Sequence, residues 1–158
     1  MDSTIYSLAY QPKRSKQEEP YHYTRVPVES VTLIADFGIE GDKKARRGSN
    51  RQLNIMSYDT VMTLSDEGYH AEPGELGEQI IVRGLDIMAL PAGSRIYLGA
   101  DAVIEIGKPR TGCDWFQQIQ DKPKDNTIGR LGVMARVLVG GVVKVGDSVA
   151  VVETEPAL

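Results

Sequence analysis

The chain has 158 residues, of which 41% are hydrophobic and 25% are charged, with a formal net charge of −4 and one cysteine. These values fit one core of ordinary size, so we expect a single domain over residues 1–158. No apolar run could span a bilayer, and an acidic chain is a poor candidate for gripping phosphate backbones, so we expect neither a membrane nor a nucleic-acid partner. A solitary cysteine excludes an internal disulfide framework; because we recognise no secretion signal, we expect a cytoplasmic protein.

Short runs of Val, Ile and Leu, separated by sixteen glycines and eight prolines, predict a mainly β fold of the barrel or sandwich type. The expected strands, in chain order, are Ile5–Tyr10, Val28–Ala35, Gln52–Met56, Gln79–Arg83, Arg95–Leu98, Ala102–Gly107, Val133–Val139 and Ser148–Val152. The polar segment 11–20 ends in proline, and we interpret it as a loop between two strands.

Two short helices are expected among these strands. Ser57 is a plausible N-cap for a helix over residues 58–67, and Gly68 suits the left-handed position after it. Thr111 is the expected N-cap of the second helix, with Asp114 three residues later as the acidic member of a capping box. The second helix is of special interest because it includes the only cysteine.

Cys113 would lie in the first turn of that helix, where free backbone N–H groups and the helix dipole favour a thiolate. Arg110 adds a positive charge, whereas the carboxylate of Asp114 opposes a second negative one. The alternative is that Cys113 is a small buried hydrophobic residue. The polar turn around Gly112 favours the first interpretation, and we expect the thiol to be accessible and reactive.

A second candidate feature is the glycine-containing cationic loop over residues 41–51. Glycines expose backbone N–H donors and arginines offer two parallel donors, so such a loop can bind a phosphate or another oxyanion. The candidate binding residues are Gly41, Asp42, Lys44, Arg46, Arg47 and Arg51, together with Arg110 beside the cysteine. A solvated charged loop is the alternative, and the segment lacks the Walker pattern.

The remaining polar residues carry weaker signals. His22 and His70 are far apart in the sequence and lack the spacing of metal ligands, so we assign no protein metal cage. Glu75 and Glu78 could hold a loop through backbone N–H groups or act as an acid and a base. We expect the structural use.

Several segments resemble the MOSC domain, which is named for the C-terminal domain of molybdenum cofactor sulfurase. The matching residues are 38–45, Arg51, 73–86, 90–113 and 129–151. Their order covers most of the chain, and the series ending in Pro-Arg-x-x-Cys is the most specific. The resemblance implies a distorted β-barrel similar to the barrel domain of pyruvate kinase, in a stand-alone member of the family.

The resemblance also implies a function centred on Cys113. Members of the family carry or transfer sulfur as a cysteine persulfide, or bind molybdenum cofactor for such chemistry or for reduction of N-hydroxylated compounds. Cys113 would then be the catalytic residue and the molybdenum ligand, and the 41–51 loop would meet the pterin phosphate or the metal oxo group. Many relatives have a histidine where this chain has Lys44, which keeps a cation but loses titration near neutrality.

The resemblance also implies partner proteins, because a chain of 158 residues cannot contain every region of the full sulfurase. The full sulfurase has a pyridoxal-phosphate desulfurase region, so we expect no pyridoxal phosphate here and a separate cysteine desulfurase or electron-donor protein as partner. Two alternatives stay open: a non-catalytic module that binds an anion or pterin through the 41–51 loop, and a β domain used for protein association.

Overall fold

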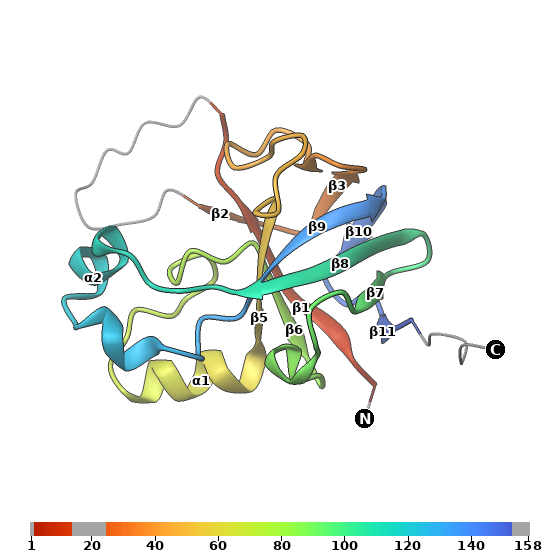
Figure 1. Cartoon of the computed structure of the whole chain (residues 1–158). Helices are drawn as coiled ribbons and strands as arrows, with labels where there is room; N and C mark the ends of the chain where they lie inside the picture. Colours follow the sequence, from red (N-terminus) through yellow and green to blue (C-terminus); the bar gives the residue numbers. More distant parts are fainter. Residues whose placement is uncertain (1, 14–24, 153–158) are drawn as a thin grey trace.

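The computed structural model describes residues 2–13 and 25–152, and within them the fold is mainly β (Figure 1). The larger sheet contains, in spatial order, β11 (Val149–Val151), β7 (Arg95–Leu98), β8 (Ala102–Pro109), β9 (Val133–Val139), β5 (Leu53–Ser57), β6 (Ile80–Arg83), β1 (Thr4–Tyr10) and β2 (Val26–Val28). The smaller sheet contains, in spatial order, β10 (Gly141–Lys144), β3 (Ser30–Ile34) and β4 (Gly38–Ile39). Strands β5 and β6 pair in parallel, which makes the larger sheet mixed. No helix in the described ranges is long and apolar enough to cross a membrane.

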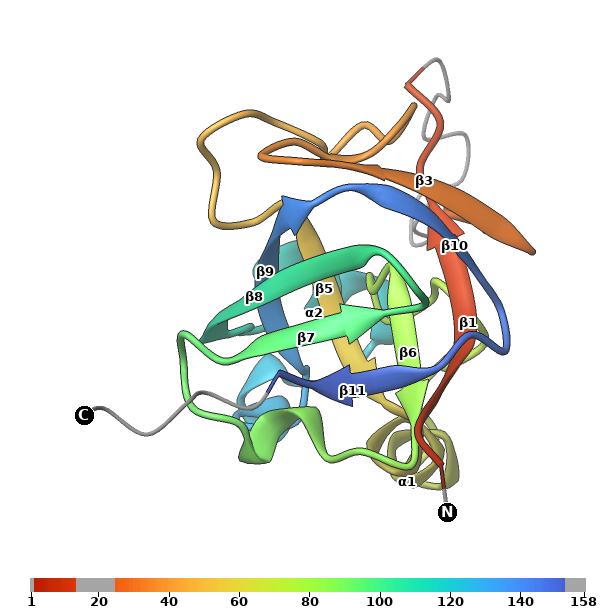
Figure 2. The same cartoon turned by 90° about the vertical axis from the view of Figure 1, so that its right-hand side faces the viewer.

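The larger sheet curls strongly but does not close into a complete barrel (Figure 2). Its end strands, β11 and β2, do not pair with each other. Strand β1 instead meets the turn between β10 and β11, where Ile5 N donates to Asp147 O at 2.9 Å and Gly146 N donates to Ile5 O at 2.8 Å. The predicted mainly β, distorted-barrel fold is therefore confirmed as an open barrel.

The inner and outer faces of the sheet follow the alternation of apolar and polar residues. Ile104 and Ile106 of β8 are buried together with Val137 of β9. Between them, Glu105 of β8 and Arg136 of β9 face outward as direct cross-strand neighbours. Because side chains alternate along a strand, a charged outer surface is fixed by the same register that fills the core.

Helix α1 (Tyr58–Asp66) begins where the sequence predicts and ends one residue earlier, but the hydroxyl of Ser57 has a different role. It makes no cap bond with the helix; it donates to Leu85 O at 2.8 Å and accepts from Ile87 N at 2.7 Å. It therefore fastens the helix start to the short helix η1 (Ile87–Ala89). Gly68, with a φ of 95°, lies directly after the helix end as expected.

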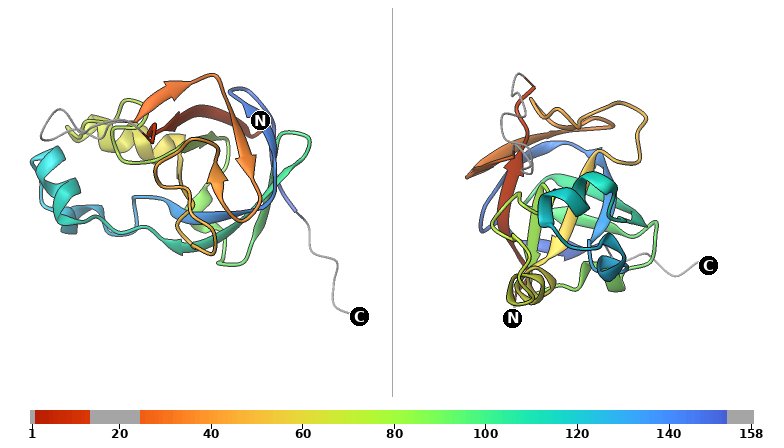
Figure 3. Two further views of the ribbon diagram at one scale, coloured as in Figure 1. Left: turned by 90° about the horizontal axis from the view of Figure 1, so that it is seen from above. Right: turned by 90° about the vertical axis from the view of Figure 1, so that its left-hand side faces the viewer.

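Helix α2 (Asp114–Gln120) begins later than the sequence predicts, and the expected capping box of Thr111 and Asp114 is wrong. The N-cap position is Cys113, so the cysteine precedes the first turn instead of lying in it. The chain stays extended after β8 because Arg110 N donates to Gly132 O at 2.9 Å. The helix projects from the barrel, as seen both in Figure 1 and from above in Figure 3.

Most of the predicted strands are confirmed, one is divided, and two short strands were not expected. Strands β7 and β9 have the predicted bounds, whereas the expected strand Val28–Ala35 is interrupted at Glu29 and divided between the two sheets. Strand β4, of two residues, and strand β10, of four, were not expected. Most of the predicted loop at 11–20, and His22, lie outside the described residues.

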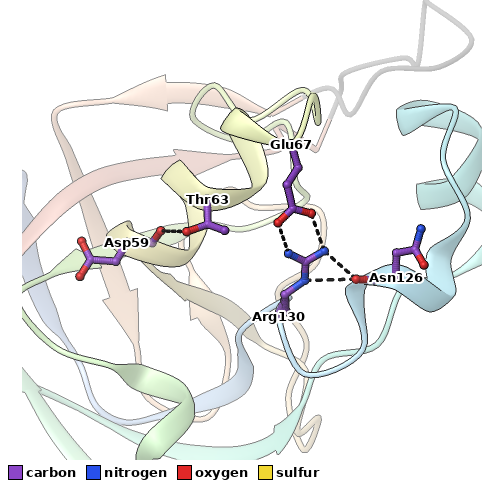
Figure 4. Close-up of polar contacts among 5 residues, drawn as sticks. All are labelled: Asp59, Thr63, Glu67, Asn126 and Arg130. Carbon is purple, nitrogen blue, oxygen red and sulfur yellow. Dashed lines mark hydrogen bonds and ion pairs between the residues drawn. The ribbon is translucent and has the colours of Figure 1, made fainter.

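An ion pair connects the end of α1 to the segment that leads into β9 (Figure 4). The guanidinium of Arg130 donates to both carboxylate oxygens of Glu67, at 2.6 and 2.9 Å, and to the carbonyl oxygen of Asn126 at 3.1 and 2.7 Å. The hydrogen bond from Arg130 lowers the pKa of Glu67. Asn126 belongs to the short helix η2 (Lys124–Thr127), so the contact also anchors the chain that follows α2.

Candidate functional site

The thiol of Cys113 is exposed and lines a cleft of about 330 Å³, which we call the Cys113 cleft. The residues that matter most for its chemistry are the cysteine, the amide of Asn54, and the cations Arg25, Lys44, Arg51 and Arg110. The cations come from separate parts of the sequence and converge on one hollow, although the chain as a whole is acidic. Such a cleft favours an anionic ligand.

The extended segment Arg110–Cys113 is held in place on both sides. Gly132, which accepts from the backbone of Arg110, has a φ of 76°, and a Cβ there would overlap the carbonyl oxygen of Ile55. The Arg110 guanidinium donates to Leu76 O and lies 5.9 Å from the centre of the Phe116 ring. These contacts orient the arginine along the wall of the Cys113 cleft.

Lys124 lies close to the cysteine, which the sequence does not reveal. An added Cβ at Gly112 would come within 3.2 Å of the Cβ of Lys124, so the lysine packs against the residue before Cys113. Its ammonium Nζ is 2.7 Å from the Oδ1 of Asp114, the residue after Cys113. Hydrogen bonding to Lys124, reinforced by its charge, lowers the pKa of Asp114. The carboxylate expected to oppose a thiolate is therefore paired with a cation.

The buried carboxylate of Glu78 holds a turn next to the Cys113 cleft. Glu78 is fully buried and accepts from Gly74 N at 2.7 Å and from Leu76 N at 3.1 Å. Burial raises its pKa, while the backbone hydrogen bonds from Gly74 and from Glu78 itself, and the charges of Arg25 and Arg110, act in the opposite direction. Gly74 has a φ of 88°, and a Cβ there would lie 2.8 Å from the Cβ of Arg25. The turn at 74–76 thus packs against Arg25, which lines the Cys113 cleft.

The interpretation of the two glutamates as loop-holding residues is confirmed by these contacts. Glu75 accepts from Glu72 N at 2.9 Å, as Glu78 does from its own turn.

The 41–51 loop divides between the Cys113 cleft and other surroundings. Lys44 and Arg51 line the cleft, where Arg110 and Cys113 join them. Asp42 is fully buried and accepts from Gln11 N at 2.9 Å and from Gln79 Nε2 at 3.2 Å, which holds the loop to the barrel.

The other three candidate residues of the loop do not line the Cys113 cleft. Gly41, with a φ of 84°, borders a separate hollow beside Tyr10. Arg46 is exposed, and its carbonyl accepts from Gln52 Nε2 at 3.1 Å. The guanidinium of Arg47 lies 5.7 Å from the centre of the Phe37 ring.

Sequence reasoning missed Arg25, Asn54, Trp115 and Met134, which also line the Cys113 cleft. Asn54 and Met134 are neighbours across β5 and β9, at half-buried positions between buried residues of their strands. That alternation is the one signal available for them, since it marks positions on the outer face.

The described part of the chain offers few side-chain ligands for a metal ion. Within residues 2–13 and 25–152, no three His, Cys, Asp or Glu side chains are placed to hold one. His70 is exposed and is not part of the Cys113 cleft. A metal held at the cleft would therefore have to bring most of its own ligands, with the thiol as the protein's contribution.

The family follows from the sequence comparison. The family model described as the MOSC domain matches residues 42–150, a range that contains Lys44, Arg51, Arg110 and Cys113. The chain belongs to the MOSC domain family. No curated protein has a matching sequence.

Solved structures support the MOSC fold. The YuaD protein from Bacillus subtilis is 20% identical, with a TM-score of 0.75 and coverage of 96% of both chains. YiiM from Geobacillus stearothermophilus is 19% identical, with a TM-score of 0.70 over 96% of this chain and 75% of that one. YiiM from Escherichia coli is also 19% identical, with a TM-score of 0.66 over 98% and 72%. At these identities the likeness concerns the fold alone.

Proposed function

We propose that this MOSC protein binds the molybdenum cofactor in the Cys113 cleft and uses Cys113 at the reactive end of the ligand. The observation that carries the proposal is the exposed thiol in one hollow with Arg25, Lys44, Arg51 and Arg110. Guanidinium groups bind phosphate through paired hydrogen bonds, and a volume of about 330 Å³ suits a small-molecule site.

The donor set of the cleft fits this cofactor. A thiolate is a soft ligand suited to sulfur-rich metal centres, and the cations suit the phosphate of the pterin. Cys113 would hold the metal end, while Lys44 and Arg51 would hold the anionic end. Once bound, the cofactor would supply a molybdenum centre that accepts sulfur or changes oxidation state.

In the sulfur-transfer form of the proposal, Cys113 acts as a sulfur carrier. Its thiolate attacks the outer sulfur of a cysteine persulfide on a separate desulfurase, forming a new S–S bond on Cys113. The donor's S–S bond breaks, and its cysteine leaves as a thiolate. The new persulfide on Cys113 then lies beside the anion-binding residues of the cleft, where an acceptor would be held.

In the reductase form, Cys113 serves only as a ligand, and an electron-donor protein supplies reducing equivalents for an N-hydroxylated substrate. The protein's own residues would then position the ligand without forming a covalent bond to sulfur from a donor. The exposure of the thiol supports both forms, since each requires a partner or ligand to reach it.

Mass spectrometry of protein isolated without reductant tests the proposal and separates its two forms. Sulfur transfer predicts Cys113 carrying one additional sulfur atom, which is lost after treatment with reductant. Ligation predicts co-purified molybdopterin that the wild type retains and Cys113→Ala loses. A wild-type protein that carries neither adduct nor cofactor, and that fails to bind added molybdopterin, would overturn the proposal.

A non-catalytic anion-binding module is the second candidate, because the cations of the cleft can bind an anion without the thiol. It predicts that Lys44→Ala with Arg51→Ala abolishes binding of molybdopterin, whereas Cys113→Ser leaves it intact. Arg46→Ala with Arg47→Ala is the matched control, since these exposed cations of the same loop lie outside the cleft. Loss of binding in Cys113→Ser would reject this candidate.

A further inference from the structure

A second hollow adjoins the Cys113 cleft on the outer face of β8 and β9, which run side by side (Figure 2). Its volume is about 450 Å³, and we call it the Glu105 cleft. The residues that define it are Arg51, Ala92, Gly93, Glu105, Lys108 and Arg136. Arg51 and Met134 line both hollows, so a ligand longer than either one could extend from the first into the second.

The lining of the Glu105 cleft includes small residues that leave room for a flat ring. Gly93 has a φ of 93°, and apart from its neighbours in the chain no residue lies within 4 Å of the position a Cβ would take. Its backbone N donates to Ile106 O at 2.7 Å, which fixes the turn beside β8. Gly107 of β8 and the exposed Ala92 complete this group. A planar heterocycle can lie against such residues with little steric hindrance.

Glu105 is the carboxylate that lines this hollow, and it retains capacity to accept hydrogen bonds. Its Oε1 lies 3.3 Å from Arg136 Nε and its Oε2 lies 3.8 Å from Arg95 Nε. A carboxylate has about four lone-pair sites, so both oxygens can accept a further donor. Its side chain is 26% exposed, which leaves it within reach of a ligand.

We propose that the Glu105 cleft binds a planar ring with a 2-amino-4-oxopyrimidine edge, the edge shared by pterins and guanine. The ring N–H and the amino group would donate in parallel to the two oxygens of Glu105. An anionic group on the same molecule would extend past Met134 to Arg51, where the two clefts meet. The inference rests on the proposed function, because it places the ring end of the ligand whose reactive end lies at Cys113.

The alternative role for Glu105 is purely structural, as the middle of a cross-strand row with Arg95 and Arg136. Exposed ion pairs of this kind add little stability, and a stabilising row requires no adjoining hollow. The two roles differ in one measurable respect. A structural carboxylate affects unfolding, whereas a recognising carboxylate determines which ring binds.

Calorimetric titration with guanosine 5′-monophosphate and inosine 5′-monophosphate tests the inference, because these probes differ only in the 2-amino group. The wild type is expected to bind the guanosine nucleotide about tenfold more tightly, the loss expected for one charge-assisted hydrogen bond. In Glu105→Gln the difference should disappear, since an amide presents a donor to one of the two ring donors. Neopterin, titrated in parallel, shows whether a pterin or a guanine ring is preferred.

Two exposed alanines provide a matched pair for the location. Ala92→Trp fills the Glu105 cleft and should abolish binding of guanosine monophosphate and neopterin. Ala100→Trp, on the exposed turn between β7 and β8, should change neither. Equal affinities of the two nucleotides for the wild type, or an unchanged ratio in Glu105→Gln with native circular dichroism, would overturn the inference.

Protection of Cys113 from alkylation by molybdopterin separates this inference from the proposed function. If molybdopterin protects the thiol but the nucleotide ratio fails, the proposed function stands and the ring assignment is wrong. If the ratio holds but molybdopterin neither binds nor protects, the Glu105 cleft is a guanine or pterin site and the proposed function fails.

Discussion

The ammonium group of Lys124 lies 2.7 Å from the carboxylate of Asp114, the residue after Cys113. The side chain of Lys124 also packs against Gly112, the residue before Cys113. The ammonium charge of Lys124 offsets the negative charge of the carboxylate next to the cysteine. In the proposed function, where the thiolate of Cys113 is the reactive form, this pairing allows an acidic residue to follow the cysteine.

Lys124→Ala is therefore expected to slow alkylation of Cys113 by iodoacetamide at neutral pH. The expected decrease in the rate constant is roughly two- to fivefold, the size of effect that exposed charges produce. Added salt should shrink the difference, because it screens the uncovered charge of Asp114. Lys144→Ala, which removes an exposed lysine of β10, is the control and should react at the wild-type rate. Identical rates for both variants would show that Lys124 does not influence the thiol.

Gly132→Ala is expected to destabilise the protein by on the order of 3 kcal/mol or more, since its Cβ would overlap the backbone of β5. Gly129→Ala is the matched control. It has a similar φ of 77° but open space around the Cβ position, so it should cost only about 1 to 2 kcal/mol of backbone strain. Urea denaturation measures both. Equal losses would mean that the close approach to Ile55 O does not constrain this turn.

Glu78 should make the free energy of unfolding fall as the pH rises. Burial raises the pKa of its carboxyl in the fold above the ordinary value of 4.5, so between these values the folded protein binds more protons than the unfolded one. Glu78→Gln removes this contribution. The difference in free energy of unfolding, variant minus wild type, should become more positive as the pH increases through this window. A pH-independent difference would contradict the assignment.

Glu67 should have the opposite effect. Its pKa is lowered in the fold by Arg130, so the pair stabilises fully above 4.5 and is lost as the pH falls through the lowered value. Glu67→Gln should be less stable than the wild type near neutrality and should converge with it in acid. Denaturation curves recorded at both ends of this range measure the effect; a constant gap would exclude the ion pair as its source.

Much of the fold could be predicted because most strands contain clear apolar runs bounded by glycine-containing turns. Strands β7 and β9 have exact ends for this reason, whereas β4 is too short to show any period. The start of α2 was misplaced because Thr111 looks like a cap by residue type, but the bond from Arg110 N to Gly132 O keeps the chain extended past it.

The candidate site was predicted only where its residues lie close in sequence or match a family motif. Cys113 and Arg110 share one motif, and Lys44 and Arg51 share one loop. Arg25 and Lys124 could not be placed, because their proximity to the cleft depends on tertiary packing against Gly74 and Gly112. Local sequence carries no signal for such contacts.

Apart from Lys44 and Arg51, which share one loop, the cations of the Cys113 cleft are distant along the chain, so folding brings their like charges together. In the unfolded chain these cations are far apart, so its affinity for a multivalent anion is lower than that of the folded protein. Thermal melting should consequently respond to whatever occupies the hollow: pyrophosphate would raise the transition temperature more than chloride at equal ionic strength, by mass action on the native state. The transition temperature therefore reports whether a ligand occupies the Cys113 cleft, and its measurement requires neither a chromophore nor a known reaction.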